Sequence, residues 1–306
     1  MNEVIHAAGL KKRFGSSDVL NGIDLTIYEG EVFGFIGHNG AGKSTFINIL
    51  TGIINKSGGS FTIMGAPDQN LDKVKSKIGV MPDISNLYDQ MRGVQFLHYM
   101  GKLAGDKRSK QDYIALMKDV GLEGAERKKI KSYSFGMRKK ICIAQALLGN
   151  PELIILDEPT SGLDPESAIN IRKLITNLQQ QGKTILLTSH NLDEIDKVSD
   201  RVGIISDGII KKLGTPSELK HNNTTNEINA AIRTSPGLTS EKLAELSATW
   251  DFEVQFVSSK KPYSVVKVKD DNDLAKLSKE LIHSGIQLFE IRIEQQSLED
   301  VFINSK

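Results

Sequence analysis

Short aliphatic runs recur through residues 1–220 and are separated by longer segments of mixed polarity. Three runs, at 153–156, 184–188 and 202–205, are rich in Ile, Leu and Val with little alternation, which is typical of strands covered on both faces. A fourth run, at 32–36, precedes a glycine-rich loop. Because helix-like stretches separate these runs, the pattern predicts an α/β core with a parallel-rich sheet.

Residues 84–150 follow a different period, with apolar side chains at i, i+3, i+4 and i+7. The positions are Phe96, Tyr99, Met100 and Leu103 in one stretch, and Tyr113, Leu116, Met117 and Val120 in the next. This spacing predicts two amphipathic helices whose apolar positions are packing faces rather than binding sites. We interpret the segment as a helical insertion within the α/β core.

The pattern breaks at Gly214-Thr215-Pro216, and the polar segment 221–226 has no apolar anchor, which is typical of a linker. Residues 221–306 then predict a small α+β C-terminal domain. Strands are expected at 227–233, 252–258, 264–268 and 286–293, and helices at 240–246 and 272–283. Their order, β-α-β-β-α-β, is that of a ferredoxin-like fold. A last short helix is expected to begin near Ser297.

Composition narrows the classes of function. The chain has 306 residues, with 39 Lys and Arg against 38 Asp and Glu, so it lacks a general electrostatic footprint for nucleic acid. The single cysteine, Cys142, excludes an internal disulfide, and its apolar neighbours predict a buried thiol in a reducing compartment. No signal peptide is visible and the apolar runs are too short to span a bilayer, so we expect any work at a membrane to require a partner.

The glycine-rich loop fits G-x-x-x-x-G-K-[ST], the phosphate-binding P-loop, between a strand-like and a helix-like run. Its residues are Gly37, His38, Asn39, Gly40, Ala41, Gly42, Lys43 and Ser44, and Thr45 follows at the helix start. The glycines let backbone N–H groups turn onto phosphate oxygens at a helix N-terminus. We expect Lys43 to reach the β- and γ-phosphates and Ser44 to bind Mg²⁺.

Acidic residues end another apolar run, since 153–156 is followed directly by Asp157 and Glu158. A P-loop site needs a carboxylate beside Mg²⁺ at the end of a neighbouring strand, and Asp157 suits that role. Glu158 is placed to polarise an attacking water. His190 follows the run at 184–188, at the edge of the sheet where α/β proteins bind ligands, and could contact the γ-phosphate or orient the water.

These motifs resemble, in order, those of the ATP-binding subunits of ABC transporters, over residues 3 to about 220. The loop 37–44 resembles Walker A, and 153–158 resembles Walker B with Glu158 as its catalytic residue. Segment 161–164, ending in Asp164, resembles the D-loop, and His190 the switch histidine. Phe14 stands where the family has an aromatic residue that stacks on adenine.

Segment 133–137 occupies the place of the family's signature, usually L-S-G-G-Q. Ser134 and Gly136 fit, whereas Tyr133, Phe135 and Met137 depart from the pattern. The retained residues preserve a hydroxyl and a helix N-terminus for a γ-phosphate. We interpret the following cations, 138–140, as a solvated helix face. Asp83 replaces the Q-loop glutamine, and it is shorter and charged.

The resemblance implies a P-loop NTPase core of the ABC ATPase type that binds ATP and Mg²⁺ and hydrolyses ATP. The chain has one P-loop and one signature, so it supplies two half-sites and requires a second ATP-binding subunit in a homodimer. A polytopic membrane subunit is the implied partner, at the cytoplasmic face of the cell membrane, and no nucleic acid is expected. The ending 297–302 is similar to that of ABC-2 exporter subunits, including antibiotic exporters.

Two other functions remain open at this point. Soluble ABC ATPases act in DNA repair or translation, but the former usually carry a long coiled coil between P-loop and signature, and the latter usually fuse two ATPase domains. A nucleotide-dependent regulator, with a C-terminal domain that binds a ligand or protein, is the other alternative. Glu158 and His190 favour turnover over sensing alone.

Overall fold

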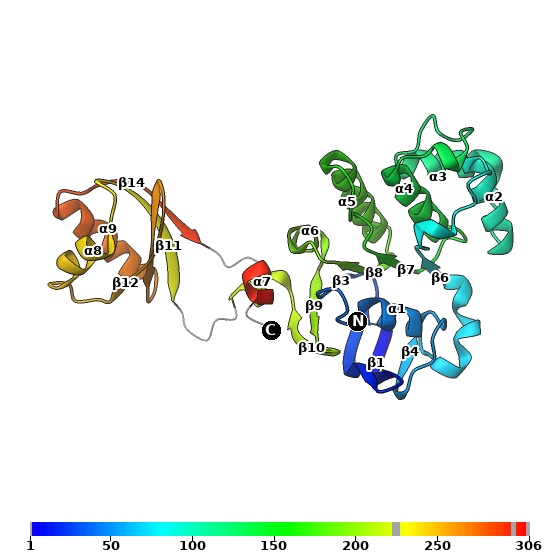
Figure 1. The fold of residues 1–306 in the computed structure, drawn as a ribbon, viewed down its shortest axis with the longest axis horizontal. Coiled ribbons are helices and arrows are strands. Elements are labelled where there is room, and N and C mark those ends of the chain that lie inside the picture. The colour runs from blue at the N-terminus through cyan, green and yellow to red at the C-terminus, as the bar shows by residue number, and fades with distance from the viewer. Residues whose placement is uncertain (1, 222–226, 295–297, 304–306) are drawn as a thin grey trace. The chain divides into compact units, whose positions relative to one another are not determined.

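The chain folds into two compact units, which a computed structural model describes over residues 2–221, 227–294 and 298–303. The first unit runs to Leu219 and includes the C-terminal helix α10 (Leu298–Ile303), and the second spans Lys220–Ser297 (Figure 1). The sequence prediction assigned everything after residue 220 to the C-terminal domain, and for α10 that assignment is wrong. Leu298 and Val301 are 2% and 1% exposed because they pack into the core of the first unit.

The first unit contains two sheets. Its strands are β1 (Glu3–Phe14), β2 (Ser17–Tyr28), β3 (Val32–Ile36), β4 (Gly58–Ile63), β5 (Ala66–Pro67), β6 (Ile78–Val80), β7 (Leu153–Asp157), β8 (Thr184–Ser189), β9 (Arg201–Ser206) and β10 (Ile209–Gly214). The larger sheet has the order β10-β9-β3-β8-β7-β6 and is parallel except for β10. The predicted parallel-rich core is therefore confirmed.

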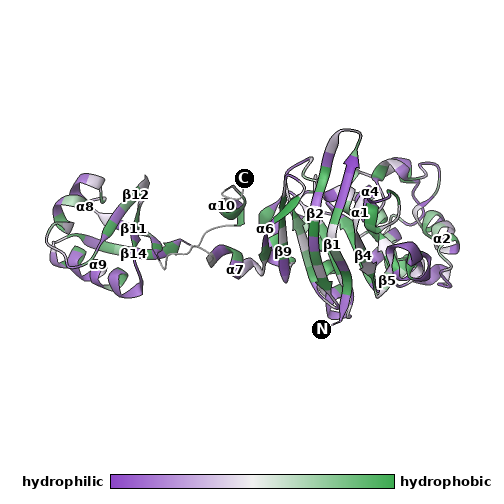
Figure 2. Cartoon of the chain, turned by 90° about the horizontal axis from the view of Figure 1, so that it is seen from below, coloured by the Kyte–Doolittle hydropathy of each residue, from purple (hydrophilic) through white to green (hydrophobic). Residues whose placement is uncertain are grey.

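The second sheet of this unit, β2-β1-β4-β5, is antiparallel and was not predicted from the sequence. Apolar and polar residues both occur along β1 and β2 (Figure 2), but register shifts interrupt their alternation. The local period of two is thereby lost at several points. This explains why a pattern-based prediction passes over the hairpin.

The helices of the first unit cover the parallel sheet. They are α1 (Lys43–Leu50), α2 (Gly93–Leu103), α3 (Lys110–Asp119), α4 (Phe135–Ala146), α5 (Pro165–Gln180), α6 (Leu192–Val198), α7 (Pro216–His221) and α10, with short 3₁₀ turns η1 (Asp68–Lys73), η2 (Lys75–Lys77), η3 (Ile84–Asn86) and η4 (Ile130–Ser132). Along β3, Val32 and Ile36 belong to the core that includes α2 to α6, while Phe33 and Phe35 belong to the core that includes α1 and the antiparallel sheet. Both faces of the parallel sheet are thus buried.

The segment between β6 and β7 is the predicted helical insertion. Tyr113 and Met117 of α3 are fully buried, as the spacing predicts. In α2 the predicted packing face is confirmed for Phe96, which is 1% exposed, and for Met100, which packs against the core, but it is wrong for Tyr99 and Leu103, which are 42% and 67% exposed. The buried face is rotated from the predicted one and also includes Val94, Leu97 and Gly101.

The second unit has the predicted order of strands and helices. Its elements are β11 (Ile228–Ser235), α8 (Ser240–Ser247), β12 (Val254–Lys260), β13 (Tyr263–Val268), α9 (Asp271–His283) and β14 (Gln287–Glu294). The sheet is antiparallel in the order β12-β13-β11-β14, which confirms the ferredoxin-like plan. The predicted linker, apart from His221 at the end of α7, lies outside the described residues, as does Ser297.

Two further sequence predictions concern single features. Cys142 is fully buried in α4, and burial raises the pKa of its thiol to about 12. In the ranges that the structure describes, none of the helices has both the length and the apolar character needed to cross a bilayer.

Candidate nucleotide site

The P-loop joins the end of β3 to the start of α1, as its motif predicts. Gly42 is the N-cap of α1 and has φ +108°, a left-handed conformation that favours glycine. Gly37 is required for a different reason, since a Cβ atom there would lie 2.6 Å from Ile205 Cγ2 and 2.7 Å from the Ile205 carbonyl oxygen. The loop is therefore held close to β9 and turned inward at the helix N-terminus, where it can present N–H groups to an anion.

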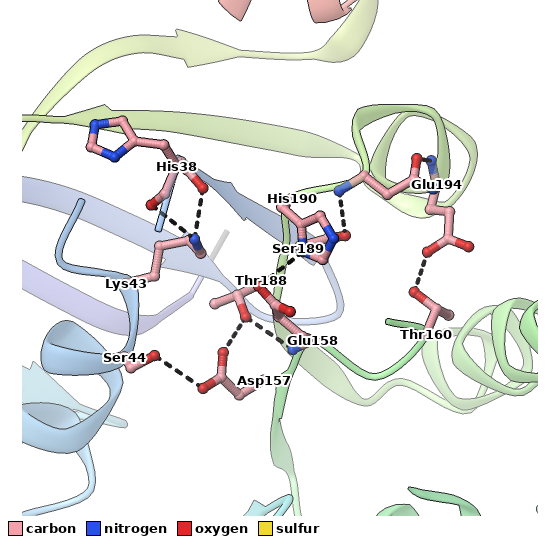
Figure 3. A network of polar contacts seen from close by, with 12 residues as sticks. His38, Lys43, Ser44, Asp157, Glu158, Thr160, Thr188, Ser189, His190 and Glu194 are labelled. Carbon is pink, nitrogen blue, oxygen red and sulfur yellow. Dashed lines mark hydrogen bonds and ion pairs between the residues drawn. The ribbon is translucent and has the colours of Figure 1, made fainter. Parts of the chain in front are cut away.

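Lys43 lies along the inside of this loop and is only 6% exposed. Its Nζ donates to the carbonyl oxygens of Gly37 at 2.6 Å and His38 at 3.3 Å (Figure 3). Burial lowers the pKa of Lys43, while the carboxylates of Glu158 and Asp157 act in the opposite direction. The ammonium is thus a desolvated cation beside two acids, where its attraction to phosphate is weakly screened.

Asp157 and Ser44 bring the strand end and the loop together. Ser44 Oγ donates to Asp157 Oδ2 at 3.2 Å, and the Thr188 hydroxyl donates to Asp157 Oδ1 (Figure 3). Thr188 lies opposite Asp157 in the parallel pairing of β7 and β8. Hydroxyl and carboxylate oxygens are the donors that Mg²⁺ prefers, so the pair fits that ion, with the remaining ligands left to water and phosphate.

Glu158 follows with φ +48°, again left-handed, although it is not glycine. Its N–H donates to Thr188 Oγ1 at 3.0 Å and to the Thr188 carbonyl oxygen at 3.2 Å. His190 comes directly after β8, and its Nδ1 lies 3.1 Å from Glu158 Oε1 (Figure 3). Because β7 and β8 are parallel neighbours, their carboxyl ends meet and bring the predicted acid and histidine together.

A pocket of about 680 Å³ is bordered by part of the P-loop and by Asp157 and Glu158. Nine of the predicted site residues line it: Asn39, Gly40, Gly42, Lys43, Ser44, Thr45, Asp83, Asp157 and Glu158. Other predicted residues are not on its wall: Phe14, Gly37, His38, Ala41, Ser134, Gly136, Asp164 and His190. Val19, Phe135 and Lys139 also line it and were not predicted there. The pocket has the size typical of small-molecule sites.

Asp83 is an exposed residue of this wall, at the N-cap of η3. Its Oδ1 accepts a hydrogen bond from the Ser85 N–H at 2.7 Å. Hydrogen bonds from Ser85 lower the pKa of Asp83. The carboxylate is therefore ionised at neutral pH and already engaged in the turn, whereas a glutamine at this position would present a neutral amide.

Ser134 and Asp164 begin helices outside the pocket. Ser134 caps α4 by accepting from the Met137 N–H at 3.3 Å, and Asp164 caps α5 by accepting from the Ser167 N–H at 2.9 Å. Hydrogen bonding from Ser167 lowers the pKa of Asp164. The ring of Phe135 lies against Gly162, where an added Cβ would be 2.8 Å from Phe135 Cε1. The signature and D-loop segments are thus in contact within one chain.

Lys139 contradicts the interpretation of 138–140 as a solvated face. It is 6% exposed, and its Nζ donates to the Glu158 carbonyl oxygen at 2.5 Å. The neighbouring Arg138 is ion-paired with Asp89 at 2.8 Å. The partner of Lys139 is a main-chain carbonyl oxygen distant in the sequence. The run of three cations therefore does not indicate that one of them is buried.

Phe14 ends β1 with 47% of its surface exposed. The Lys12 ammonium lies 4.6 Å from the centre of its ring. One face of the ring therefore carries a cation, and Val19 of β2, rather than Phe14, lines the pocket.

Comparison with known proteins connects this geometry to a family. A family model described as ABC transporter matches residues 20–161. The uncharacterized ABC transporter ATP-binding protein YdbJ of Bacillus subtilis is 33% identical over 99% of this chain and 95% of its own length. The daunorubicin/doxorubicin resistance ATP-binding protein DrrA of Streptomyces peucetius is 30% identical over 98% of this chain and 91% of its own.

A solved structure agrees with these matches. The cbiO1 protein of Clostridium perfringens, part of the ABC transporter complex cbiONQ, is 27% identical with a TM-score of 0.64. The likeness covers 72% of this chain and 92% of that one.

Proposed function

The chain belongs to the family of ABC transporter ATP-binding proteins, as an ATPase subunit, and on that premise we propose that it drives export through a separate membrane-spanning subunit. The observation that carries the proposal is the meeting of Ser44 and Asp157 at 3.2 Å, in a pocket that Lys43 and Glu158 also line. Loop, cation, acid and general base are the parts that phosphoryl transfer to water requires.

Each residue then has a chemical role. Lys43 and the loop N–H groups hold the β- and γ-phosphates, and Ser44 with Asp157 hold Mg²⁺. When bound, Mg²⁺ would neutralise charge that develops on the phosphate oxygens. Glu158 accepts a proton from the attacking water, and His190, 3.1 Å from its carboxylate, keeps that carboxylate oriented toward the γ-phosphate side.

The chain supplies two half-sites of a head-to-tail homodimer. Ser134, Gly136 and Asp164 do not line the chain's own pocket, and Ser134 is exposed at the N-terminus of α4. This is the arrangement expected if they complete the pocket of a second copy. Closure of the dimer then adds contacts between ATP and the second copy, and hydrolysis removes these added contacts, so the ligand can drive a conformational cycle.

The helical insertion offers a surface for the membrane subunit. Tyr88, Tyr99 and Leu103 are 49%, 42% and 67% exposed, and the two tyrosine rings lie 5.9 Å apart. A cluster of large exposed apolar side chains is typical of a protein interface. The partner is a polytopic subunit, and the chain acts at the cytoplasmic face of its membrane.

Export is supported by a relative that is matched over both units. DrrA is named a daunorubicin/doxorubicin resistance ATP-binding protein, and 98% of this chain aligns with it. Resistance by an ATP-binding transport protein is consistent with outward movement of the drug. We propose the direction for this chain, and the chemistry of the cargo belongs to the membrane subunit.

Two measurements test the proposal. Glu158→Gln should bind ATP with affinity near that of the parent but lose about 10²- to 10⁴-fold in turnover, because only the general base is removed.

Affinity purification from membranes should recover a polytopic protein with the parent chain, and less of it with Leu103→Asp. Parental turnover in Glu158→Gln would reject the site, whereas recovery of ribosomes or DNA in place of a membrane protein would reject the transport role.

A further inference from the structure

Lys139 is a buried cation that the chemistry described so far does not use. It lies in the second turn of α4, and its ammonium donates to the main chain of Glu158 at 2.5 Å. Burial lowers the pKa of Lys139, while Glu158, Asp157, Cys142 and Glu194 raise it, with Glu158 the largest of the raising groups. A buried ammonium is unfavourable unless it is well paired, so its contact is a specific one.

The main chain of Glu158 is held from both sides. Its N–H donates to Thr188 on β8, and its carbonyl accepts from Lys139 on α4. Between these anchors the residue adopts φ +48°, which a residue with a Cβ atom rarely adopts without support from its surroundings. The direction of the Glu158 side chain follows from that backbone conformation, because the Cα–Cβ bond turns with it.

We propose that Lys139 is a positioning residue for ATP hydrolysis, which holds the Glu158 carbonyl and so aims the Glu158 carboxylate at the attacking water. The inference rests on the proposed role of Glu158. It extends that role to α4, whose N-terminus carries Ser134. The helix that presents Ser134 to a second subunit would thereby also hold the general base of its own half-site.

Lys139→Met tests the proposal because it keeps most of the side-chain stem and removes the donor. We expect kcat for ATP hydrolysis to fall about tenfold or more while KM changes less than about twofold, since the lost contact is to Glu158 and not to nucleotide. Lys140→Met, on the same helix and half-buried, is the matched control and should keep kcat within about twofold. Lys139→Leu, which also lacks a donor, replaces the methionine variant if that variant melts far below the parent.

A second background separates positioning from a general structural effect. In Glu158→Gln, single-turnover hydrolysis should change less than about twofold when Lys139→Met is added, because the group it positions is already absent. An equal fractional loss in both backgrounds would overturn the proposal. So would a rise of about tenfold in KM at unchanged kcat, which would mean that Lys139 contacts nucleotide. Parental turnover in Glu158→Gln alone would instead reject the role of Glu158.

Discussion

Thr188→Val is the most informative single change beside Ser44 and Asp157, the residues proposed to hold Mg²⁺. Thr188 is fully buried, and its hydroxyl donates to the Asp157 carboxylate while accepting from the Glu158 N–H at 3.0 Å. Valine has nearly the same shape but no hydroxyl. A hydrogen bond to a charged group contributes about 1.5–3 kcal/mol, so the free energy of unfolding should fall by about that amount.

Thr188→Val should also weaken the response of ATP hydrolysis to Mg²⁺, because the Asp157 carboxylate loses a hydrogen bond that orients it. Without the hydroxyl, its carboxylate is no longer fixed toward Ser44, and loss of a group that orients a metal ligand typically costs about 10- to 100-fold in metal affinity or activity. The concentration of Mg²⁺ that half-saturates ATP hydrolysis should therefore rise about tenfold or more. Urea unfolding and a Mg²⁺ titration at fixed ATP measure the two effects.

Two variants serve as controls. Thr188→Ser keeps the hydroxyl and should retain the Mg²⁺ requirement of the parent. Thr184→Val removes a hydroxyl on the same strand that accepts from the Gly30 N–H at 3.0 Å, away from the pocket, so it should lower stability without changing the Mg²⁺ requirement. The reasoning is refuted if Thr188→Val has parental Mg²⁺ dependence, or if Thr184→Val alters it equally.

Three further predictions address the loop, the insertion and the thiol. Lys43→Ala should weaken ATP binding about tenfold or more in calorimetric titration, because a desolvated cation is lost from the phosphate loop, and unchanged affinity would contradict the phosphate assignment. Tyr113→Phe should raise the free energy of unfolding by about 1 kcal/mol in urea, since the buried hydroxyl has no hydrogen-bond partner among the described residues, and a decrease would contradict this. Cys142 should resist iodoacetamide at pH 8 in the native protein and react in denaturant, because a pKa of about 12 keeps the thiol protonated, and rapid native labelling would show that it is not buried.

The sequence predicts the loop and the strand ends well because their chemistry is local. A glycine-rich loop between a strand and a helix constrains its own backbone, and Asp157, Glu158 and His190 follow apolar runs directly. Parallel strands bring such ends to one edge whichever of them are neighbours. The grouping of these residues was thus predictable without knowing the strand order.

The parts that were missed depend on contacts between segments distant in sequence. Nothing in the sequence distinguishes Thr188 from the rest of its aliphatic strand. Its importance depends on the strand register, which places it opposite Asp157. Lys139 stands among three consecutive cations, and its partner is a carbonyl group, which every residue type carries. The helix period located α2 but only part of its buried face, because Tyr99 and Leu103 are as apolar as Phe96, which packs as predicted.

Helix α10 gives the second unit an unusual place in the chain. Leu298 and Val301 belong to the same apolar core as Leu192 and Ile195 of α6, and α6 begins two residues after His190. In the sequence, the second unit is thus inserted within the first, which continues at α10. A stop codon after residue 297 would remove packing from α6, whereas excising 222–297 and rejoining the chain would keep α10. Only the second variant tests what the second unit itself contributes to function.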